Sequence, residues 1–444
     1  MTYDLGIEGG DVVMPGGVNR GHVYVADGRV AVVGPERCDA RERVDASGLL
    51  VFPGMVDSHV HLMDPADPSR EDFPTGTAAA ARAGVTTLIE HTHAEPVITA
   101  DDLERKRTYL RDRSRIDFGL AAHAWPGRQD EIADVWRAGV AFVKAFTCTT
   151  HGLQGFTADE LQALFSSVAS VGAVCLVHAE DEALTSDAEA RLRASGRDDG
   201  GIVPDWRTRE AELTALERTA LLARRTGARV VAAHVSHPAA LEAADGLVVE
   251  SCPQYLTLRE GEVLDQGAFR KFTPPARART DADLDAMWSA LANGRIDYVS
   301  TDHAPSTPEQ KRAGSIWDVH FGLPGLDTTF SVLLDGAHAG RITYSRVAAA
   351  YAEAPARLYG LWPRKGSLDV GADADIVLVD PAEEWTVRDE DVISKAGWSP
   401  YAGRTLVGRA VRTYGRGRLL AADGEVVAEP GWGRWVPGAG ASGG

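Results

Sequence analysis

The chain has 444 residues, of which 44% are hydrophobic and 25% are charged, and these ordinary globular values exclude a disordered or fibrous protein. Acidic residues outnumber Lys and Arg by 64 to 46, which gives a formal net charge of −18. A surface this negative repels nucleic acid and anionic membranes, so neither is expected as a partner.

Nothing in the sequence predicts transport into or across a membrane. No apolar run reaches the roughly 20 residues that span a bilayer, and the N-terminal segment shows neither the basic nor the apolar part of a signal peptide. The cysteines are Cys38, Cys148, Cys175 and Cys252, none of which forms a CxxC pair. We therefore expect free thiols in a reducing environment and a cytoplasmic protein.

Both ends of the chain are predicted to be β-rich. In residues 1–52, short apolar runs alternate with Gly-rich and Asp-Gly turns, and residues 364–444 repeat this pattern. We expect the two ends to pair into one small sandwich or sheet, so that the chain leaves this domain and later returns to it. Residues 438–444, GAGASGG, are predicted to form a loose tail.

The middle of the chain, residues 53–363, alternates apolar β-type runs with longer amphipathic stretches. The runs cover residues 49–59, 84–91, 116–123, 139–146, 173–180, 228–236, 246–254 and 297–305. Strands that alternate with helices indicate a parallel sheet, and eight such units indicate a (β/α)₈ TIM barrel. The predicted fold is therefore α/β, a TIM barrel with a small β-sandwich domain built from both chain ends.

Polar residues stand at the ends of five predicted strands, where a barrel places its active site. His59 and His61 close the first strand, and residues two apart on a strand share a face, so both imidazoles can point into the barrel mouth. The polar residues on the other strands are Lys144, His178, His234 and Asp302. A single histidine at such a position is usually structural or faces solvent, but four histidines with a carboxylate suit a divalent ion. The sequence therefore predicts a metal site.

Lys144 lies in the apolar run AFVKAF of a chain that has six lysines and forty arginines. A buried ammonium without a partner is costly and tends to lose its proton. One explanation is an ion pair with a nearby carboxylate. The other is a neutral amine that captures CO₂, because the resulting carbamate is an anion with two oxygens that can bridge two cations.

Several motifs together resemble the cyclic amidohydrolases of the amidohydrolase superfamily, which include dihydroorotases, allantoinases and hydantoinases (dihydropyrimidinases). The motifs are PGMVDSHVHL, VKAF, VHAE, HVSH, ESCPQYL, STDHAP, PPAR at 274–277, GADADIVLVDP and SPYAGRTLVGRAVRTYGRG. The resemblance covers nearly the whole chain, and it implies that the two β-rich ends form one sandwich beside the barrel. As a set the motifs are specific for the family and much less specific for the substrate.

The resemblance implies a role for each polar residue at the strand ends. It implies two divalent ions, most simply Zn²⁺: His59 and His61 are similar to ligands of the first, His178 and His234 to ligands of the second, and carboxylated Lys144 to the bridge between them. Asp302 is similar to the residue that binds the first ion and handles the proton of a metal-bridging hydroxide. In that scheme the hydroxide attacks a ring amide carbonyl, and the ring opens when the proton reaches the leaving nitrogen.

Motif details favour allantoinase within this group. Dihydroorotases typically carry an Arg two residues after HxH and an Asn in a PNT segment, which hold the substrate carboxylate, but this chain has Met63 and Thr92-His93-Ala94 there. Hydantoinases typically carry a Tyr five residues after the bridging Lys, where this chain has Thr149. Allantoinases have a Cys four residues on and a Ser or Thr six residues on, which Cys148 and Thr150 match.

Substrate contacts are also expected outside the ligand set. They are Thr150, Thr273, His93, Phe321 and Gly322. The end of the second strand departs from the family pattern, because His91 and His93 share one strand face there. These two could hydrogen-bond behind the metal ligands, select the substrate or hold a further metal ion. The charged segment 181–210 is either a surface excursion or a lid over the pocket.

The favoured function is metal-dependent ring opening of a cyclic ureide similar to allantoin or a hydantoin. The alternatives are a dihydropyrimidinase, a cyclic-imide hydrolase, or a dihydroorotase-like enzyme with a non-standard substrate. Two further classes are a non-catalytic relative, which would have lost metal ligands, and a hydrolase of acyclic amides, which often uses one metal ion and lacks the VKAF lysine. The family commonly forms homodimers or homotetramers, and the sequence does not decide between them.

Overall fold

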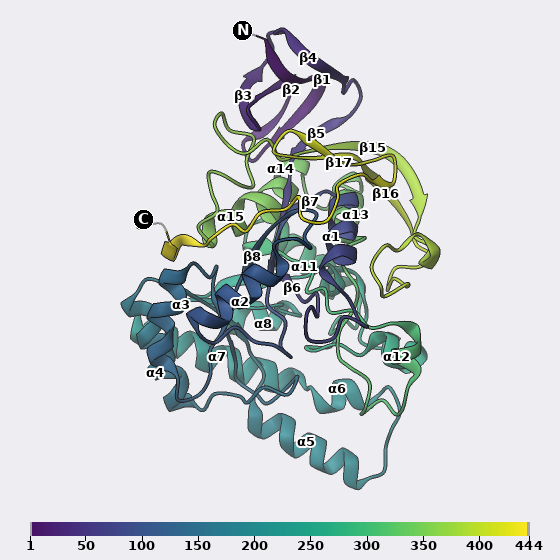
Figure 1. Ribbon diagram of the computed structural model, residues 1–444. Helices are drawn as coiled ribbons and strands as arrows, with labels where there is room; N and C mark the ends of the chain where they lie inside the picture. Colours follow the sequence, from purple (N-terminus) through teal and green to yellow (C-terminus); the bar gives the residue numbers. More distant parts are fainter. Residues whose placement is uncertain (1, 442–444) are drawn as a thin grey trace.

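The computed structural model describes residues 2–441, in which a parallel barrel occupies the middle of the chain (Figure 1). Its strands are β6 (Met55–Val60), β7 (Val85–Glu90), β8 (Asp117–Leu120) continued by β9 (Ala122–His123), β10 (Val143–Phe146), β11 (Val174–His178), β12 (Arg229–Ala232), β13 (Val248–Ser251) and β14 (Tyr298–Val299). Consecutive strands pair in parallel, and a parallel bridge between Val60 and His303 joins the last strand region to the first. The predicted TIM barrel is confirmed.

Helices and short helical turns connect the barrel strands. They are α1 (Phe73–Arg82), α2 (Ala100–Leu110), η1 (Gln129–Glu131), α3 (Ile132–Ala138), α4 (Ala158–Ser170), α5 (Glu182–Ala194), α6 (Ile202–Trp206), α7 (Arg209–Thr226), α8 (Pro238–Ala243), α9 (Pro253–Thr257), α10 (Glu262–Gln266), η2 (Gly267–Arg270), α11 (Asp281–Ala292), α12 (Pro308–Arg312), α13 (Thr329–His338), α14 (Tyr344–Ala348), η3 (Ala349–Glu353) and α15 (Ala354–Leu358). Capping boxes at Thr99, Thr157 and Thr280 start α2, α4 and α11 by satisfying their first backbone N–H groups. Within residues 2–441, none of these helices has the length and apolar character that crossing a bilayer requires.

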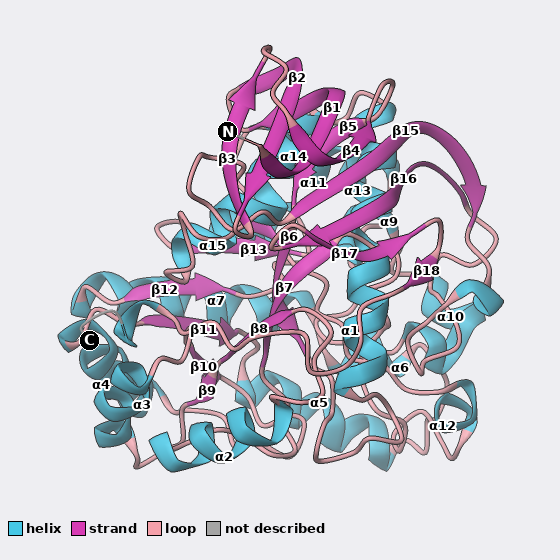
Figure 2. Ribbon diagram, turned by 45° about the horizontal axis from the view of Figure 1, so that its top comes forward, coloured by secondary structure: helices cyan, strands magenta, loops and turns pink. Residues whose placement is uncertain are grey.

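The two ends of the chain form one hydrogen-bonded sheet, as predicted (Figure 2). Its strands are β1 (Tyr3–Met14), β2 (Gly17–Ala26), β3 (Arg29–Gly34), β4 (Ala40–Asp45), β5 (Leu50–Pro53), β15 (Ile376–Thr386), β16 (Thr405–Gly415), β17 (Arg418–Ala422) and β18 (Glu425–Val426). The order is β18-β17-β16-β15-β5-β1-β2-β3, with β4 paired to β1. The ends meet where β5 pairs antiparallel with β15, at Val51 opposite Leu378. Both side chains are buried in an apolar cluster of this domain that is separate from the barrel core.

The first predicted strand, residues 49–59, is divided between the two domains. Its first part is β5, which belongs to the sheet of the chain ends, and its second part is β6, which enters the barrel. Gly54 lies at the division, where a Cβ atom would collide with the Thr86 hydroxyl. A glycine permits this close approach, so the chain changes sheets within a single apolar run.

A buried charge network holds the barrel against the end domain. Lys365 Nζ lies 2.5 Å from Asp117 of β8, 3.0 Å from Asp373 and 2.9 Å from Asp375, which precedes β15. Arg416, in the turn between β16 and β17, also pairs with Asp117. Lys365 is fully buried, and its pKa is raised because the attraction of these carboxylates outweighs burial.

The prediction of a loose tail at residues 438–444 is wrong for residues 438–441. The Gly438 N–H donates to the carbonyl of Gly139, and Ala439–Ala441 form a short helical turn, η5, against α3. A Cβ atom at Gly440 would collide with the Trp136 carbonyl, so the glycines that suggested a loose tail instead allow close backbone packing. Residues 442–444 lie outside the described residues.

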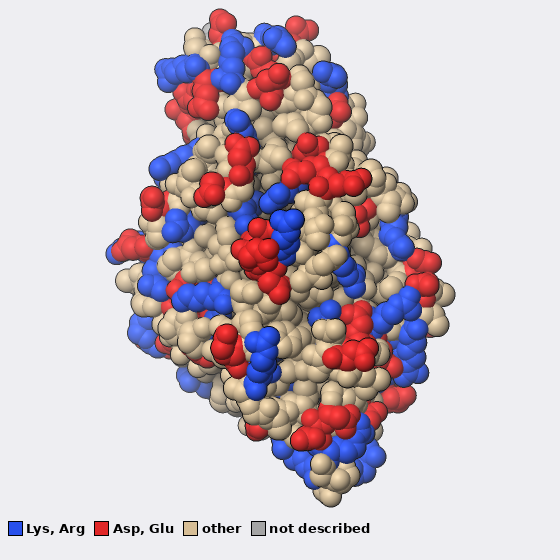
Figure 3. Space-filling model, turned by 90° about the vertical axis from the view of Figure 1, so that its right-hand side faces the viewer, with Lys and Arg blue, Asp and Glu red and all other residues tan. Residues whose placement is uncertain are grey.

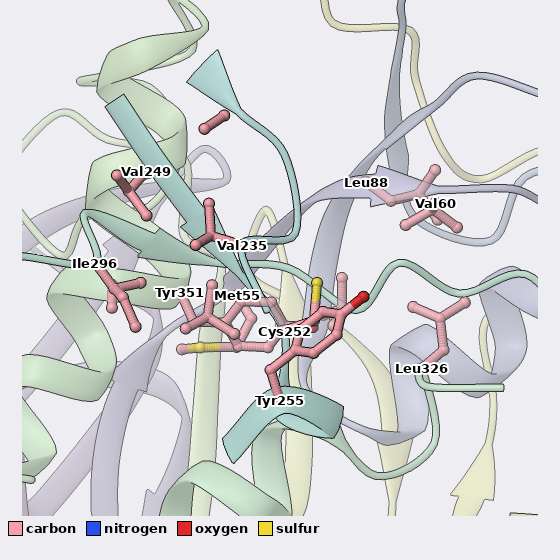
Figure 4. Close-up of a cluster of buried hydrophobic side chains, with 14 of the residues drawn as sticks. Met55, Val60, Leu88, Val235, Val249, Cys252, Tyr255, Ile296, Leu326 and Tyr351 are labelled. Carbon is pink, nitrogen blue, oxygen red and sulfur yellow. The ribbon is translucent and has the colours of Figure 1, made fainter. Parts of the chain in front are cut away.

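The largest apolar cluster joins the barrel strands to the segments around them. Figure 4 shows part of it, where Met55 of β6 lies near Cys252 and Tyr351, and Leu88 of β7 lies near Val60. On the face in Figure 3, acidic and basic side chains are interspersed and form no large area of one sign. In Figure 1, α5 and α12 lie at the end of the molecule opposite the sheet of the chain ends.

Candidate metal centre

The structure brings together His59, His61 and Asp302, three of the residues expected to bind metal. His59 and His61 lie at the end of β6 and directly after it, and Asp302 follows β14. The Nε2 atom of each imidazole is 3.3 Å from Asp302 Oδ1. Both imidazoles are buried, whereas 16% of the Asp302 side chain is exposed, so the carboxylate reaches the cavity at the barrel mouth.

His178 and His234 form the second histidine pair. His178 ends β11 and His234 follows β12, and His178 Nδ1 lies 3.0 Å from His234 Nε2. The ring centroids of His234 and His59 are 5.5 Å apart, so the two pairs adjoin. His178 Nε2 also contacts a carboxylate oxygen of Glu180 at 2.8 Å, so both of its ring nitrogens are engaged.

Lys144 lies in β10 and lines the same cavity with its side chain 99% buried. Its Nζ has no hydrogen-bond partner and no carboxylate within ion-pair distance among residues 2–441. Burial lowers the pKa of Lys144 to about 8, against the opposing attraction of Glu250 and Asp302. The side chain is therefore not the ion-paired lysine of the first explanation, and a neutral amine is accessible near physiological pH.

The donor set fits divalent metal ions. Zinc prefers imidazole nitrogen and carboxylate oxygen, and His59 Nε2, His234 Nδ1 and Lys144 Nζ are buried without a hydrogen-bond partner among the described residues. Nitrogens of His59, His61 and His91 also lie within 4.8 Å of one another, a spacing at which three ligands can hold one ion.

Glu250 of β13 orients the ligands from behind. Its carboxylate accepts hydrogen bonds from the His234 backbone N–H at 3.0 Å and the Tyr298 hydroxyl at 2.8 Å, and it contacts His59 Nδ1 at 2.7 Å. Such a contact fixes which imidazole nitrogen is left for a metal ion. Burial raises the pKa of Glu250 to about 7, although Lys144 opposes the shift. No role is predicted for Glu250, which lies in the middle of the seventh predicted strand, where no local pattern of the sequence singles it out.

Two expected ligands adopt strained backbone conformations. The φ angle is 41° at His234 and 48° at Asp302, in the left-handed region that non-glycine residues rarely occupy. Such residues cost about 1–3 kcal/mol each and concentrate at functional sites. The strain therefore indicates that these two side chains are held in the barrel mouth for a function.

The barrel mouth holds a cavity of about 430 Å³. Four of the five expected substrate contacts line it, namely His93, Thr273, Phe321 and Gly322. Thr150 does not: its backbone pairs with Leu153, and its hydroxyl lies 3.5 Å from a guanidinium nitrogen of Arg207. The next residue, His151, has a φ of 54° and lines the cavity instead. The local turn thus brings His151 to the cavity in place of the expected Thr150.

His91 and His93 have different surroundings. Neither ring nitrogen of His91 has a hydrogen-bond partner among the described residues, and its ring centroid is 4.4 Å from that of His61. The His91 carbonyl contacts His61 Nδ1 at 3.0 Å. His93 lines the cavity, and its Nδ1 lies 3.0 Å from His123 Nε2. His91 therefore does not line the cavity but lies within reach of an ion held by His59 and His61, whereas His93 lines the cavity and is placed to select a substrate.

Glu180 is a buried carboxylate beside the second histidine pair. It contacts His178, accepts a hydrogen bond from the Thr273 hydroxyl at 2.7 Å, and lies 3.3 Å from Arg207. Burial raises its pKa, but the charge of Arg207 and the hydrogen bonds outweigh that effect and lower the pKa to about 2. The Thr273 hydroxyl is thus occupied by its hydrogen bond to Glu180. The backbone of Thr273 is therefore the part that can contact a substrate.

Two buried lysines fix one wall of the cavity, the loop 316–322. Lys271 Nζ donates to the carbonyls of Ile316, Trp317 and Val319, and Lys311 Nζ donates to those of His320 and Gly322. These contacts hold the backbone of Phe321 and Gly322 in place. The rarity of lysine in the sequence was the available signal for these two residues.

The segment 181–210 packs on this wall. It contains α5 and α6, and the ring centroid of Trp206 lies 5.0 Å from that of Trp317 and 5.3 Å from that of Phe321. The Arg193 guanidinium of α5 lies 4.2 Å from the Trp317 ring centroid. The segment therefore covers one side of the cavity, although its opening and closing as a lid stays a prediction.

Comparisons with known proteins agree with this arrangement. The model of the Amidohydrolase family matches residues 50–399. An allantoinase of Solibacter usitatus is 34% identical over 96% of this chain and 95% of its own length, and a dihydroorotase of Halobacterium salinarum is 35% identical over 91% and 96%. The solved L-hydantoinase (dihydropyrimidinase) of Arthrobacter aurescens superimposes with a TM-score of 0.93 at 31% identity, covering 98% of this chain and 100% of that one.

Proposed function

The chain belongs to the amidohydrolase family, and on that basis we propose that it hydrolyses an amide C–N bond of a cyclic ureide, allantoin or a hydantoin, and so opens the ring. The observation that carries the proposal is the meeting of two histidine pairs, Asp302 and an unpaired lysine at one cavity. A non-catalytic relative would have no reason to keep this costly cluster of buried polar groups.

The metal ions proposed for this site are two divalent ions, most simply Zn²⁺. When bound, they would polarise the ring carbonyl and lower the pKa of a water molecule. His59 and His61 would hold one ion with Asp302, and His178 and His234 would hold the other. Glu250 keeps His59 in the orientation that this requires.

Lys144 is proposed to complete the donor set as a carbamate. Its neutral amine attacks CO₂, a bond forms between Nζ and the carbon, and one amine proton is released to solvent. The pKa of about 8 makes the neutral amine available, and the absence of a hydrogen bond to Nζ within the described residues leaves it free to react. The two carbamate oxygens would then serve as anionic ligands.

Asp302 is proposed to move the proton of the reaction. Its carboxylate lies beside the first histidine pair and reaches the cavity, so it can accept a proton from the attacking water. It then delivers that proton to the ring nitrogen as the C–N bond breaks. The product is an open-chain acid that carries the former ring carbonyl as its carboxylate.

Two sequence features support a ureide over dihydroorotate. One is that Cys148 and Thr150 stand at the spacing expected of allantoinases. The other is that Met63 lines the cavity at the position where dihydroorotases carry an arginine, so that way of holding a ring carboxylate is missing.

We further expect the protein to form a homodimer or homotetramer. Its mass in solution, measured by analytical ultracentrifugation, would establish which.

A substrate panel tests the proposal. The purified, metal-loaded protein is incubated with allantoin, hydantoin, dihydrouracil, dihydroorotate and a cyclic imide, and ring opening is followed by the gain of one water in the product mass. We expect turnover of allantoin or a hydantoin that Asp302→Asn abolishes. Turnover of the cyclic imide or dihydrouracil alone would replace the ureide with one of the alternatives, and no turnover of any ring would refute the function.

A further inference from the structure

Arg70 is a buried cation in the cavity that the proposed reaction does not use. It lies in the loop between β6 and α1, its side chain is about nine-tenths buried, and it lines the same cavity as the expected metal ligands. Its Nε donates to the Pro305 carbonyl at 2.9 Å. Among residues 2–441, no carboxylate oxygen lies within ion-pair distance of its guanidinium, and its terminal nitrogens make no hydrogen bond.

The other buried arginines of the described chain differ from Arg70 in this respect. Arg207 lies 3.3 Å from Glu180, and Arg277 lies 3.6 Å from Glu212. Burying a guanidinium without an anion is costly, so Arg70 is expected to bind an anion from outside the chain. The free Nη1 and Nη2 atoms form a planar fork whose geometry matches a carboxylate.

The charges around Arg70 leave this fork available. Of the two carboxylates that line the cavity, Asp302 lies against His59 and His61, and Asp318 is bound by the backbone and hydroxyl of Ser315. Asp67 attracts Arg70 only from beyond ion-pair distance. Burial lowers the pKa of Arg70 to about 10, so the guanidinium stays charged at neutral pH.

The neighbouring lysines cannot substitute for Arg70. Lys271 and Lys311 are also buried on this side of the cavity, but each directs its three N–H donors at backbone carbonyls. Neither lysine therefore has a free N–H donor to offer a substrate. A phosphate would need more donors than one guanidinium fork supplies, whereas a single carboxylate is satisfied by it.

We propose that the substrate ring carries a carboxylate substituent and that Arg70 binds this group in the cavity, an inference that rests on the proposed ring opening and names its substrate class. Arg70 stands seven residues beyond Met63, so this is not the arginine position expected of dihydroorotases.

The first test compares two substrates on the wild-type protein. One is a hydantoin with a 2-carboxyethyl side chain, and the other is its carboxamide, which has nearly the same size and no charge. The charged hydrogen bonds should favour the acid by about 10- to 100-fold in kcat/KM, mainly through KM. Equal kcat/KM values for the two rings would overturn the inference while leaving the proposed ring opening intact.

The second test changes Arg70. Arg70→Met should remove the preference for the acid. It should change kcat/KM for the carboxamide by no more than about threefold, because the uncharged carboxamide forms no charged pair with the guanidinium. Arg128→Met, which alters an arginine outside the cavity lining, is the matched control and should keep the preference. Equal losses on both substrates in Arg70→Met would show a structural role and refute the assignment. If that variant does not fold, the wild-type comparison decides, and failure of both rings to open would instead refute the proposed function.

Discussion

Replacing Lys144 by Met should stabilise the metal-free protein while abolishing its activity. Methionine has nearly the same volume and no charge, and Lys144 Nζ has no hydrogen bond or ion pair to lose among the described residues. Lowering the lysine pKa from 10.5 to about 8 costs the folded state about 3 kcal/mol at pH 7, since each tenfold change in protonation equilibrium is about 1.4 kcal/mol. The variant removes that cost together with the carbamate ligand.

The pH dependence has a definite sign. The folded-state pKa of Lys144 is below its unfolded value of 10.5, so protonation favours the unfolded chain. The advantage of Lys144→Met is therefore complete below a pH of about 8 and disappears as the pH rises towards 10.5. Urea unfolding of both proteins is measured from pH 7 to pH 10, after chelation and in CO₂-free buffer so that the amine stays unmodified.

Lys365→Met provides the matched control, because it alters another fully buried lysine that does have partners. Three carboxylates lie within 3.0 Å of Lys365 Nζ, and removing the cation would leave them unpaired, at a cost of about 3–5 kcal/mol. The two substitutions should thus shift stability in opposite directions. A metal-free Lys144→Met protein less stable than wild type would show that Lys144 is a satisfied ammonium, and the argument for a neutral amine would fail.

Two further predictions concern Asp302 and His237. Asp302→Asn should lower kcat by about 10²- to 10⁴-fold while metal content measured by elemental analysis stays close to wild type, and near-native turnover would refute the proton-transfer role. Burial, then the charges of Arg277 and Arg209, lower the pKa of His237 to about 3, so its contribution to stability is complete above pH 6.5 and is lost as the pH falls below that value. Between pH 7.5 and pH 5, His237→Gln should lose about 2 kcal/mol less stability than wild type in urea unfolding, and parallel losses would contradict the shift.

The barrel and the positions of the expected ligands could be predicted because both follow from short-range rules. Alternating strands and helices indicate the barrel, and strand ends collect at one face of it, which places His59, His178 and Asp302 together without knowledge of the loops. Glu250 was missed because it lies within an apolar run where a carboxylate carries no local pattern. Its role depends on a contact with His59 from a strand 191 residues away in sequence.

The cavity wall was harder to predict because it is built by loops, whose paths periodicity does not determine. The resemblance to allantoinases predicts Thr150 in the cavity, but a left-handed turn places His151 there. Arg70 gave no signal in the sequence, since it is one of forty arginines and only its missing partner distinguishes it. The glycines of the C-terminal segment were misleading, because the same residues suit a loose tail and close backbone packing.

The most direct test of the central claim is a metal titration followed by activity. Metal-free wild-type protein in bicarbonate buffer receives increasing Zn²⁺ while ring opening of the best ureide is measured. We predict no turnover without metal and a rise that ends at about two ions per chain, with the mass of a carbamate on Lys144 in the loaded protein. Full turnover in the presence of a chelator, or a fully active enzyme whose Lys144 is unmodified and which holds a single ion, would contradict it.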